Sequence, residues 1–141
     1  MKIIDRLLED KIHISFEVFP PKTDAGYEKV RSATEQIAGL HPSYISVTYG
    51  AGGGTSKNTA KIASYIRDEL GVESLAHLTC ASSTKAEVQT VIENLKALGI
   101  ENILALRGDI PEGMVFPSED RYHYAYELVE AIRRSGDFCI G

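Results

Sequence analysis

The sequence has little cysteine, no tryptophan and no excess of positive charge. Its two cysteines, Cys80 and Cys139, lie far apart in apolar segments. Two such residues form neither a disulfide framework nor a metal-binding spacing, so we expect reduced thiols, a cytoplasmic location and no metal site. The formal net charge is -5 and there is no basic run, which argues against a nucleic-acid partner.

Long apolar runs are also missing. No apolar stretch approaches the roughly 20 residues that a membrane-spanning helix needs, so we expect no membrane association. Charges separate Ile3, Ile4, Leu7 and Leu8 in helical spacing, unlike the apolar core of a signal peptide. With 43% hydrophobic and 25% charged residues, residues 1–141 have the composition of one globular domain.

Short apolar segments alternate along the chain with amphipathic ones. The short segments have the length and periodicity of strands, and the amphipathic ones have the spacing of helices. The predicted strands are 12–19, 44–49, 74–79 and 103–106, with the start of a fifth at 138–141. The predicted helices are about 24–40, 57–70, 85–98 and 122–134.

The strand ends recur at a regular interval. Glu17, Thr48, His77 and Asp109 are 31, 29 and 32 residues apart, which indicates successive parallel βα units. Right-handed crossovers curl such a sheet toward a (βα)8 TIM barrel, which needs eight units. We therefore expect an α/β fold with only the first four units and the start of strand five, as in a truncated half-barrel. Its open sheet edges favour a homo-oligomer.

Side-chain alternation predicts that the polar strand ends share one face. This face would line the interior near the carboxyl ends of the strands, where α/β proteins place their chemistry. On the fourth strand the same reasoning assigns Leu104 and Leu106 to the opposite side, against the helices. The residues predicted to share the interior face are Glu17, Thr48, His77, Arg107 and Asp109.

Each candidate also has an ordinary structural interpretation. Apolar neighbours around Glu17 would favour its protonated form and suit a general acid, but a structural pair with Arg107 is equally compatible. Arg107 and Asp109 could pair with each other, although their place after a strand favours function. His77 alone could be a satisfied core histidine. The glycine-rich loop 50–55 completes neither a Walker sequence nor G-x-G-x-x-G. It indicates a flexible loop that a flat ligand can approach, with nonspecific anion binding as the less favoured alternative.

Four ordered segments carry a family resemblance. Ser15–Pro21, Ser46–Ala51, Ala76–Cys80 and Asn102–Asp109 resemble the methylenetetrahydrofolate reductase family of flavin-dependent barrel enzymes. The likeness covers all 141 residues, but the later segments of that family are absent.

The resemblance implies reduction of 5,10-methylenetetrahydrofolate to 5-methyltetrahydrofolate. FAD, in preference to FMN, would take a hydride from NADH or NADPH and pass it to the folate. Glu17 matches the acid that protonates the folate nitrogen, and Asp109 matches the aspartate between flavin and folate. The resemblance places the following residues around the flavin: Thr48, Tyr49, Ala51, His77, Arg107, Gly108, Asp109, Tyr124 and Ala125.

Two other interpretations stay open. One is a different FAD-linked barrel oxidoreductase, similar to proline dehydrogenase. The other is a non-catalytic half-barrel that self-associates or pairs with a separate second half.

Overall fold

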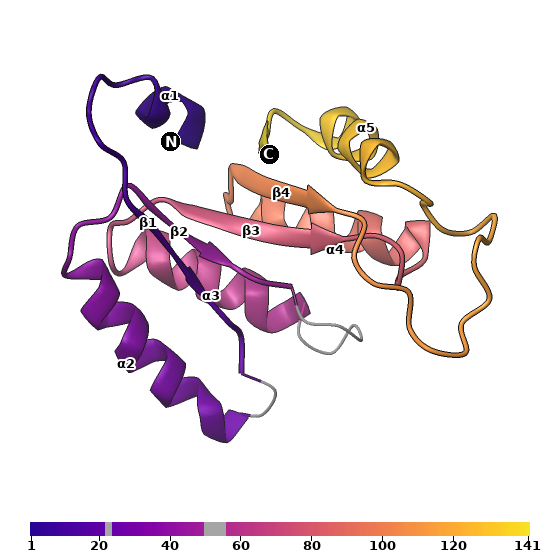
Figure 1. Ribbon diagram of the computed structural model, residues 1–141, viewed down its shortest axis with the longest axis horizontal. Coiled ribbons are helices and arrows are strands. Elements are labelled where there is room, and N and C mark those ends of the chain that lie inside the picture. The colour runs from indigo at the N-terminus through magenta and orange to yellow at the C-terminus, as the bar shows by residue number, and fades with distance from the viewer. Residues whose placement is uncertain (22–23, 50–55) are drawn as a thin grey trace.

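The computed structural model describes residues 1–21, 24–49 and 56–141, and within them five parallel strands form one sheet in chain order (Figure 1). The strands are β1 (Ser15–Val18), β2 (Tyr44–Val47), β3 (Ser74–Thr79), β4 (Asn102–Leu106) and β5 (Cys139–Ile140). The helices are α1 (Ile3–Leu7), the 3₁₀ helix η1 (Asp24–Gly26), α2 (Tyr27–Ala38), α3 (Ser56–Asp68), α4 (Lys85–Ala97) and α5 (Ala125–Ser135). The predicted α/β fold is confirmed, and the parallel sheet with its helices is that of a partial TIM barrel.

Helix α4 shows how local sequence sets the boundaries of these elements. The Thr84 hydroxyl accepts a hydrogen bond from the Glu87 backbone N–H at 3.2 Å, and the Glu87 carboxylate accepts one from the Thr84 N–H at 2.7 Å. This capping box satisfies two backbone donors at the start of the helix. Gly99 follows the helix with φ of 71°, a conformation that favours glycine.

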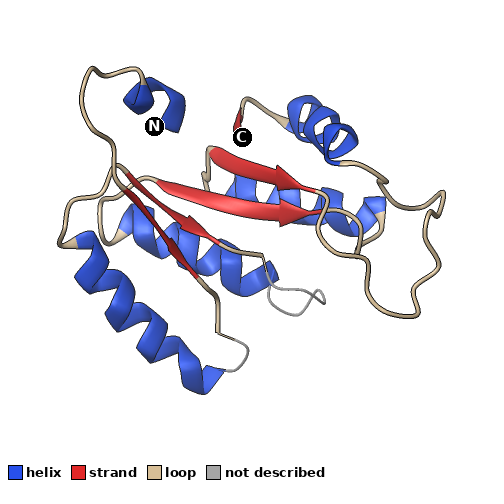
Figure 2. Cartoon of the chain, in the orientation of Figure 1, coloured by secondary structure: helices blue, strands red, loops and turns tan. Residues whose placement is uncertain are grey.

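One face of the sheet forms the core. Ile45, Val47, Ala76, Leu78 and Ile103 are fully buried there, under helices that lie behind the sheet (Figure 2). The helical residues that complete this core include Ile62, Ile66, Ile92, Leu95, Leu128 and Ile132. Burial of this apolar surface is the main stabilising contribution to such a fold.

The register of β4 contradicts one sequence prediction. His77 pairs with Leu104 and Thr79 with Leu106. Partners in neighbouring parallel strands share a face, so both leucines lie on the helix-free face with His77. Their predicted place against the helices is wrong, and Ile103 is among the residues found there instead. Both faces of this strand are apolar because a barrel interior is itself packed with side chains, so polarity could not distinguish them.

The first strand is shorter than predicted. Residues 12–14 precede β1, and Ile12 and Ile14 are exposed. The β1–β2 ladder begins where Ser15 pairs with Tyr44, just after the Ser43 N–H donates to the Ile14 carbonyl at 2.8 Å. The partner strand therefore sets this boundary, which the alternation of apolar residues overestimated.

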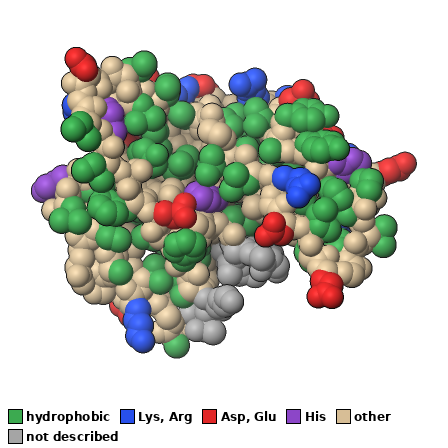
Figure 3. Space-filling model, viewed as in Figure 1, with side chains coloured by type: hydrophobic (Ala, Val, Ile, Leu, Met, Phe, Trp, Pro, Cys, Tyr) green, Lys and Arg blue, Asp and Glu red, His purple; other side chains and the backbone are tan. Residues whose placement is uncertain are grey.

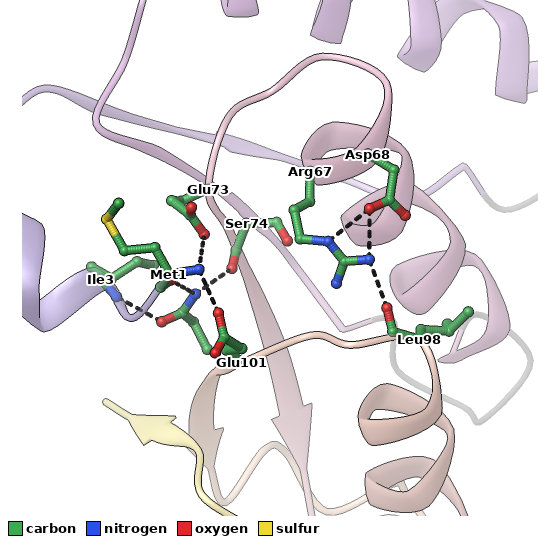
Figure 4. Close-up of polar contacts among 9 residues, drawn as sticks. Met1, Ile3, Arg67, Asp68, Glu73, Ser74, Leu98 and Glu101 are labelled. Carbon is green, nitrogen blue, oxygen red and sulfur yellow. Dashed lines mark hydrogen bonds and ion pairs between the residues drawn. The ribbon is translucent and has the colours of Figure 1, made fainter.

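Asn102 joins helix α1 to the amino end of the sheet. Its amide oxygen accepts a hydrogen bond from the Ile3 N–H at 2.7 Å. Its amide nitrogen donates to the carbonyls of Met1 at 3.1 Å and Ser74 at 3.2 Å. Figure 4 shows Met1, Ile3 and Ser74 in this cluster, and it also draws a separate contact in which Arg67 donates to the Leu98 carbonyl at 2.7 Å. The buried Asn102 thus places α1 at the end of the sheet opposite the carboxyl ends of the strands.

The helix-free face of the sheet is partly open to solvent. The view in Figure 3 shows hydrophobic side chains among scattered charges and histidines. Leu106, which lies on this face, is 37% exposed. None of the described helices is both long and apolar enough to cross a membrane.

Candidate active site

Glu17, Ser46 and His77 meet on the helix-free face of the sheet. Glu17 and Ser46 are partners in the β1–β2 register, and His77 lies two residues beyond Leu75, the partner of Ser46 on β3. The Ser46 hydroxyl donates to Oε2 of Glu17 at 3.2 Å. Nε2 of His77 lies 3.4 Å from the same oxygen. The predicted proximity of Glu17 and His77 is therefore confirmed.

His77 is not a satisfied core histidine. The residue is 8% exposed, and Nε2 is buried without a well-formed hydrogen bond in the described part of the chain. Burial lowers the pKa of His77, and the nearby Glu17 carboxylate opposes this effect only in part. The neutral imidazole is therefore favoured near neutral pH, with a polar nitrogen directed toward Glu17.

Glu17 differs from its prediction in two respects. Its side chain is 44% exposed, so the desolvation expected from the flanking apolar residues is absent in this chain. The sheet leaves this face open, and the apolar neighbour Val18 points to the core. The proposed structural pair with Arg107 is also wrong, since Glu17 contacts Ser46 and His77 instead.

A tight turn follows β4. Gly108 has φ of 76°, and a Cβ on this residue would lie 2.8 Å from Cβ of Thr79. Only glycine fits so close to the end of β3 without a shift. Arg107 and Asp109 flank this glycine beyond the last residue of β4, and both are exposed. Within residues 1–21, 24–49 and 56–141 neither forms an ion pair, so the interpretation as a mutual structural pair is not supported.

The backbone carbonyl of Arg107 connects the end of β4 to the segment that follows β3. Its carbonyl accepts hydrogen bonds from the N–H groups of Cys80 at 3.1 Å and Ala81 at 2.8 Å. The Cys80 thiol also lies 3.7 Å from this carbonyl and 3.9 Å from the Tyr124 carbonyl. Burial raises the pKa of Cys80 to about 11, so the thiol stays protonated and can donate. These hydrogen bonds connect the ends of β3 and β4 to the residue before α5.

Thr48 and Tyr49 continue directly from β2 at the same edge of the sheet. The Thr48 N–H donates to the Val18 carbonyl at 3.0 Å, and its own carbonyl accepts from the Thr59 hydroxyl at 2.9 Å. Tyr49 is half-buried against the core. Ala51, the third residue predicted in this segment, lies outside the described residues.

Tyr124 and Ala125 lie at the start of α5. The helix begins at Ala125, later than predicted, because the Glu127 carboxylate accepts the N–H groups of His123 at 2.6 Å and Tyr124 at 2.8 Å. The Tyr124 ring is exposed and stacks on Tyr126, with 5.9 Å between ring centroids. The structure therefore places the Tyr124 backbone near the end of β3, but directs no contact from its ring to Glu17 or His77 in the described residues.

The chemistry of this edge fits an organic cofactor. Nε2 of His77 is buried 3.4 Å from Oε2 of Glu17, with no well-formed hydrogen bond among the described residues, and the glycine turn keeps side-chain bulk away from the end of β4. No group of three or more His, Cys, Asp or Glu that could hold a metal occurs in the part of the chain that the structure describes. The Glu17 carboxyl group at this edge is exposed, so it is accessible to a ligand.

Parallel βα units with polar groups at the carboxyl ends of their strands define an α/β barrel protein with an active-site edge. Comparison with known families refines this class. The family model described as methylenetetrahydrofolate reductase matches residues 2–141. The chain belongs to the methylenetetrahydrofolate reductase family.

Curated relatives support this assignment. The chain is 37% identical over 145 residues to methylenetetrahydrofolate reductase (NADH) 1 of Zea mays, across 98% of this chain and 24% of the maize protein. It is 36% identical over 133 residues to 5,10-methylenetetrahydrofolate reductase of Escherichia coli strain K12, across 94% of this chain and 44% of that protein. The chain thus spans less than half the length of these relatives.

Proposed function

We propose that residues 1–141 form the N-terminal half of a barrel that reduces 5,10-methylenetetrahydrofolate to 5-methyltetrahydrofolate. The observation that carries this proposal is the meeting of Glu17, Ser46 and His77 at the active-site edge of a chain from this family. The proposal includes a cytoplasmic location and a single domain over the whole chain. It concerns the longer enzyme of which this half-barrel would be a part.

Glu17 is assigned as the general acid. It would donate a proton to the ring nitrogen of the folate, so that the five-membered ring opens to an iminium cation. Its position on the open face makes the carboxyl group accessible to a ligand. The other two members of the cluster suit this role less well, because a serine hydroxyl and a neutral imidazole are much weaker acids than a carboxylic acid.

Asp109 is assigned to electrostatic stabilisation. It follows the glycine turn at the end of β4, on the same edge of the sheet as Thr79 and His77. Its negative charge would stabilise a cation that develops on the folate, and such stabilisation is strongest where water is excluded. Asp109 is exposed in this chain, so ligands and the remaining barrel walls would have to supply that exclusion.

The cofactor assignment is FAD, with a nicotinamide nucleotide as the reductant. A bound FAD would supply hydride transfer, which no amino-acid side chain performs. The name of the maize relative includes NADH, which favours NADH over NADPH. The residues assigned to hold the flavin are Thr48, Tyr49, Ala51, His77, Arg107, Gly108, Asp109, Tyr124 and Ala125.

An anaerobic assay of the flavin-loaded enzyme tests the proposal. NADH should bleach the flavin absorbance, and 5,10-methylenetetrahydrofolate should then restore it with formation of 5-methyltetrahydrofolate. A flavin that is reduced by proline and not by NADH would favour the proline dehydrogenase-like alternative. If the longer protein that contains residues 1–141 never binds flavin, the non-catalytic half-barrel is favoured.

A further inference from the structure

The two oxygens of the Glu17 carboxylate have different surroundings. Both polar contacts of the cluster reach Oε2: the Ser46 hydroxyl at 3.2 Å and Nε2 of His77 at 3.4 Å. In the described part of the chain no hydrogen bond reaches Oε1. The Ser46 hydroxyl and the His77 ring come from β2 and β3, so they approach the carboxylate from neighbouring strands of the sheet.

We propose that Ser46 and His77 are positioning residues that hold Oε2 of Glu17, so that the transferable proton is carried by Oε1. This inference rests on the proposed role of Glu17 as the acid. During the transfer the O–H bond at Oε1 breaks and its electron pair stays on the carboxylate. The proton forms a new N–H bond on the folate nitrogen, so the step needs no other reactant.

The protonation state of His77 agrees with this arrangement. A neutral imidazole carries one proton, and it can donate toward Oε2 only when that proton is on Nε2. The burial of His77 favours the neutral form. In that form the ring does not compete with Glu17 as an acid, and it shares the Oε2 atom with the Ser46 hydroxyl.

The Ser46 hydrogen bond and the His77 contact should both stabilise the transition state more than the ground state. Before the transfer, Oε2 is the carbonyl oxygen of a neutral acid, and afterwards it belongs to a carboxylate. Hydrogen bonds to a charged acceptor are roughly twice as strong as those to a neutral one. Interactions that strengthen along the reaction accelerate it. We therefore expect loss of the Ser46 bond to slow proton transfer about tenfold.

The role of the Ser46 hydroxyl can be tested with two variants and a matched control. Its side chain is 7% exposed, and its other acceptor, the Phe16 carbonyl, lies at 3.5 Å. Ser46→Ala removes the hydroxyl, and Ser46→Thr retains it with a residue that strands accommodate well. Ser43→Ala is the matched control, because Ser43 contacts a histidine, His13, at 3.0 Å near the opposite end of the same strand.

The kinetic arm of the test uses the flavin-loaded enzyme. In Ser46→Ala, kcat for folate reduction should fall about tenfold, while KM for folate changes less than twofold. Ser46→Thr should restore most of the rate, and Ser43→Ala should match the wild type. A Ser46→Ala enzyme with the wild-type rate, or a Ser46→Thr enzyme as slow as Ser46→Ala, would overturn the positioning role.

A second arm does not depend on catalysis. Nitrogen-15 NMR of the histidine-labelled 141-residue chain shows which ring nitrogen of His77 carries the proton. We expect the proton on Nε2, and a proton on Nδ1 would overturn the proposed contact. Glu17→Gln separates the two proposals: if it leaves folate reduction intact, the assigned acid is wrong. If it stops folate reduction while Ser46→Ala has no effect, only the positioning role is wrong.

Discussion

At the scale of single residues, His77 links the candidate site to the stability of the fold. Burial lowers its pKa below the ordinary value of 6.5, so the unfolded chain binds a proton more readily than the folded one. The contribution of the neutral His77 to the free energy of unfolding should therefore be fully present above about pH 6.5. It should be lost as the pH decreases through the lowered pKa of the folded state. Urea unfolding between pH 5 and 8 should show this slope, and His77→Gln should flatten it. An unchanged slope in His77→Gln would assign the pH dependence to other groups.

Gly108 and Gly113 form a matched pair for testing the turn after β4. Their φ angles are 76° and 77°, but a Cβ on Gly108 would lie 2.8 Å from Thr79, whereas none of the described atoms lies within 4 Å of one on Gly113. Either change to alanine should lower the free energy of unfolding by about 1 kcal/mol through backbone strain. Gly108→Ala should lower the free energy of unfolding further, because its Cβ would also clash with Thr79. Equal losses in urea unfolding would contradict this account of the turn.

At the scale of elements, helix α4 offers two threonines with opposite expected effects. Thr84→Ala removes the N-cap hydroxyl and should lower the free energy of unfolding by about 1 kcal/mol. Thr90 lies inside the helix, where its hydroxyl donates to the Ala86 carbonyl at 3.0 Å. Thr90→Ala should be neutral or stabilising by a few tenths of a kcal/mol, because alanine is the better helix former. A similar decrease in the free energy of unfolding in both variants would show that loss of the capping box does not explain the effect of Thr84→Ala.

The elements also show how far the sequence could predict the structure. The boundaries of α4 follow from Thr84, Glu87 and Gly99, whose local chemistry is decisive by itself. The meeting of Glu17 with His77 follows from strand alternation, because β1 and β3 each place polar residues on the face opposite to their buried apolar ones. The same rule failed on β4, where Leu104 and Ile103 are both apolar although they lie on opposite faces.

Other features of the site depend on tertiary contacts that no local pattern encodes. A serine such as Ser46 in a strand is unremarkable until its register with Glu17 is known. The bond from Cys80 to the Arg107 carbonyl joins the ends of two strands and involves no motif. Glu17 is exposed because the described sheet leaves this face open, which its flanking apolar residues do not encode.

At the scale of the whole molecule, the open face should control self-association. Strand β1 pairs only with β2 in the described residues, and Leu106 on the helix-free face is 37% exposed. We expect the 141-residue chain to be dimeric or larger, since a second copy would cover such surfaces. Light scattering should show Leu106→Ser shifted toward the monomer. Val115→Ser, a control at an exposed apolar residue in the loop before α5, should keep the wild-type mass. A stable wild-type monomer would contradict this expectation.

The same open face predicts weak flavin binding by the 141-residue chain alone. In the proposed barrel, residues 1–141 would supply only part of the flavin site, and the surface near Glu17 is accessible to water. Titration with FAD, followed by flavin fluorescence, should give weak binding or none. Tight stoichiometric binding would mean that the first half of the barrel holds far more of the flavin site than assigned.

Stopped-flow measurement of the two half-reactions in Glu17→Gln tests whether Glu17 is the acid that protonates the folate. Glutamine keeps the shape of the side chain but cannot donate the acid proton. The enzyme that contains this half-barrel should keep near-normal flavin reduction by NADH and lose reduction of 5,10-methylenetetrahydrofolate. If both half-reactions fall together, or if folate reduction persists, Glu17 is not the acid of this site.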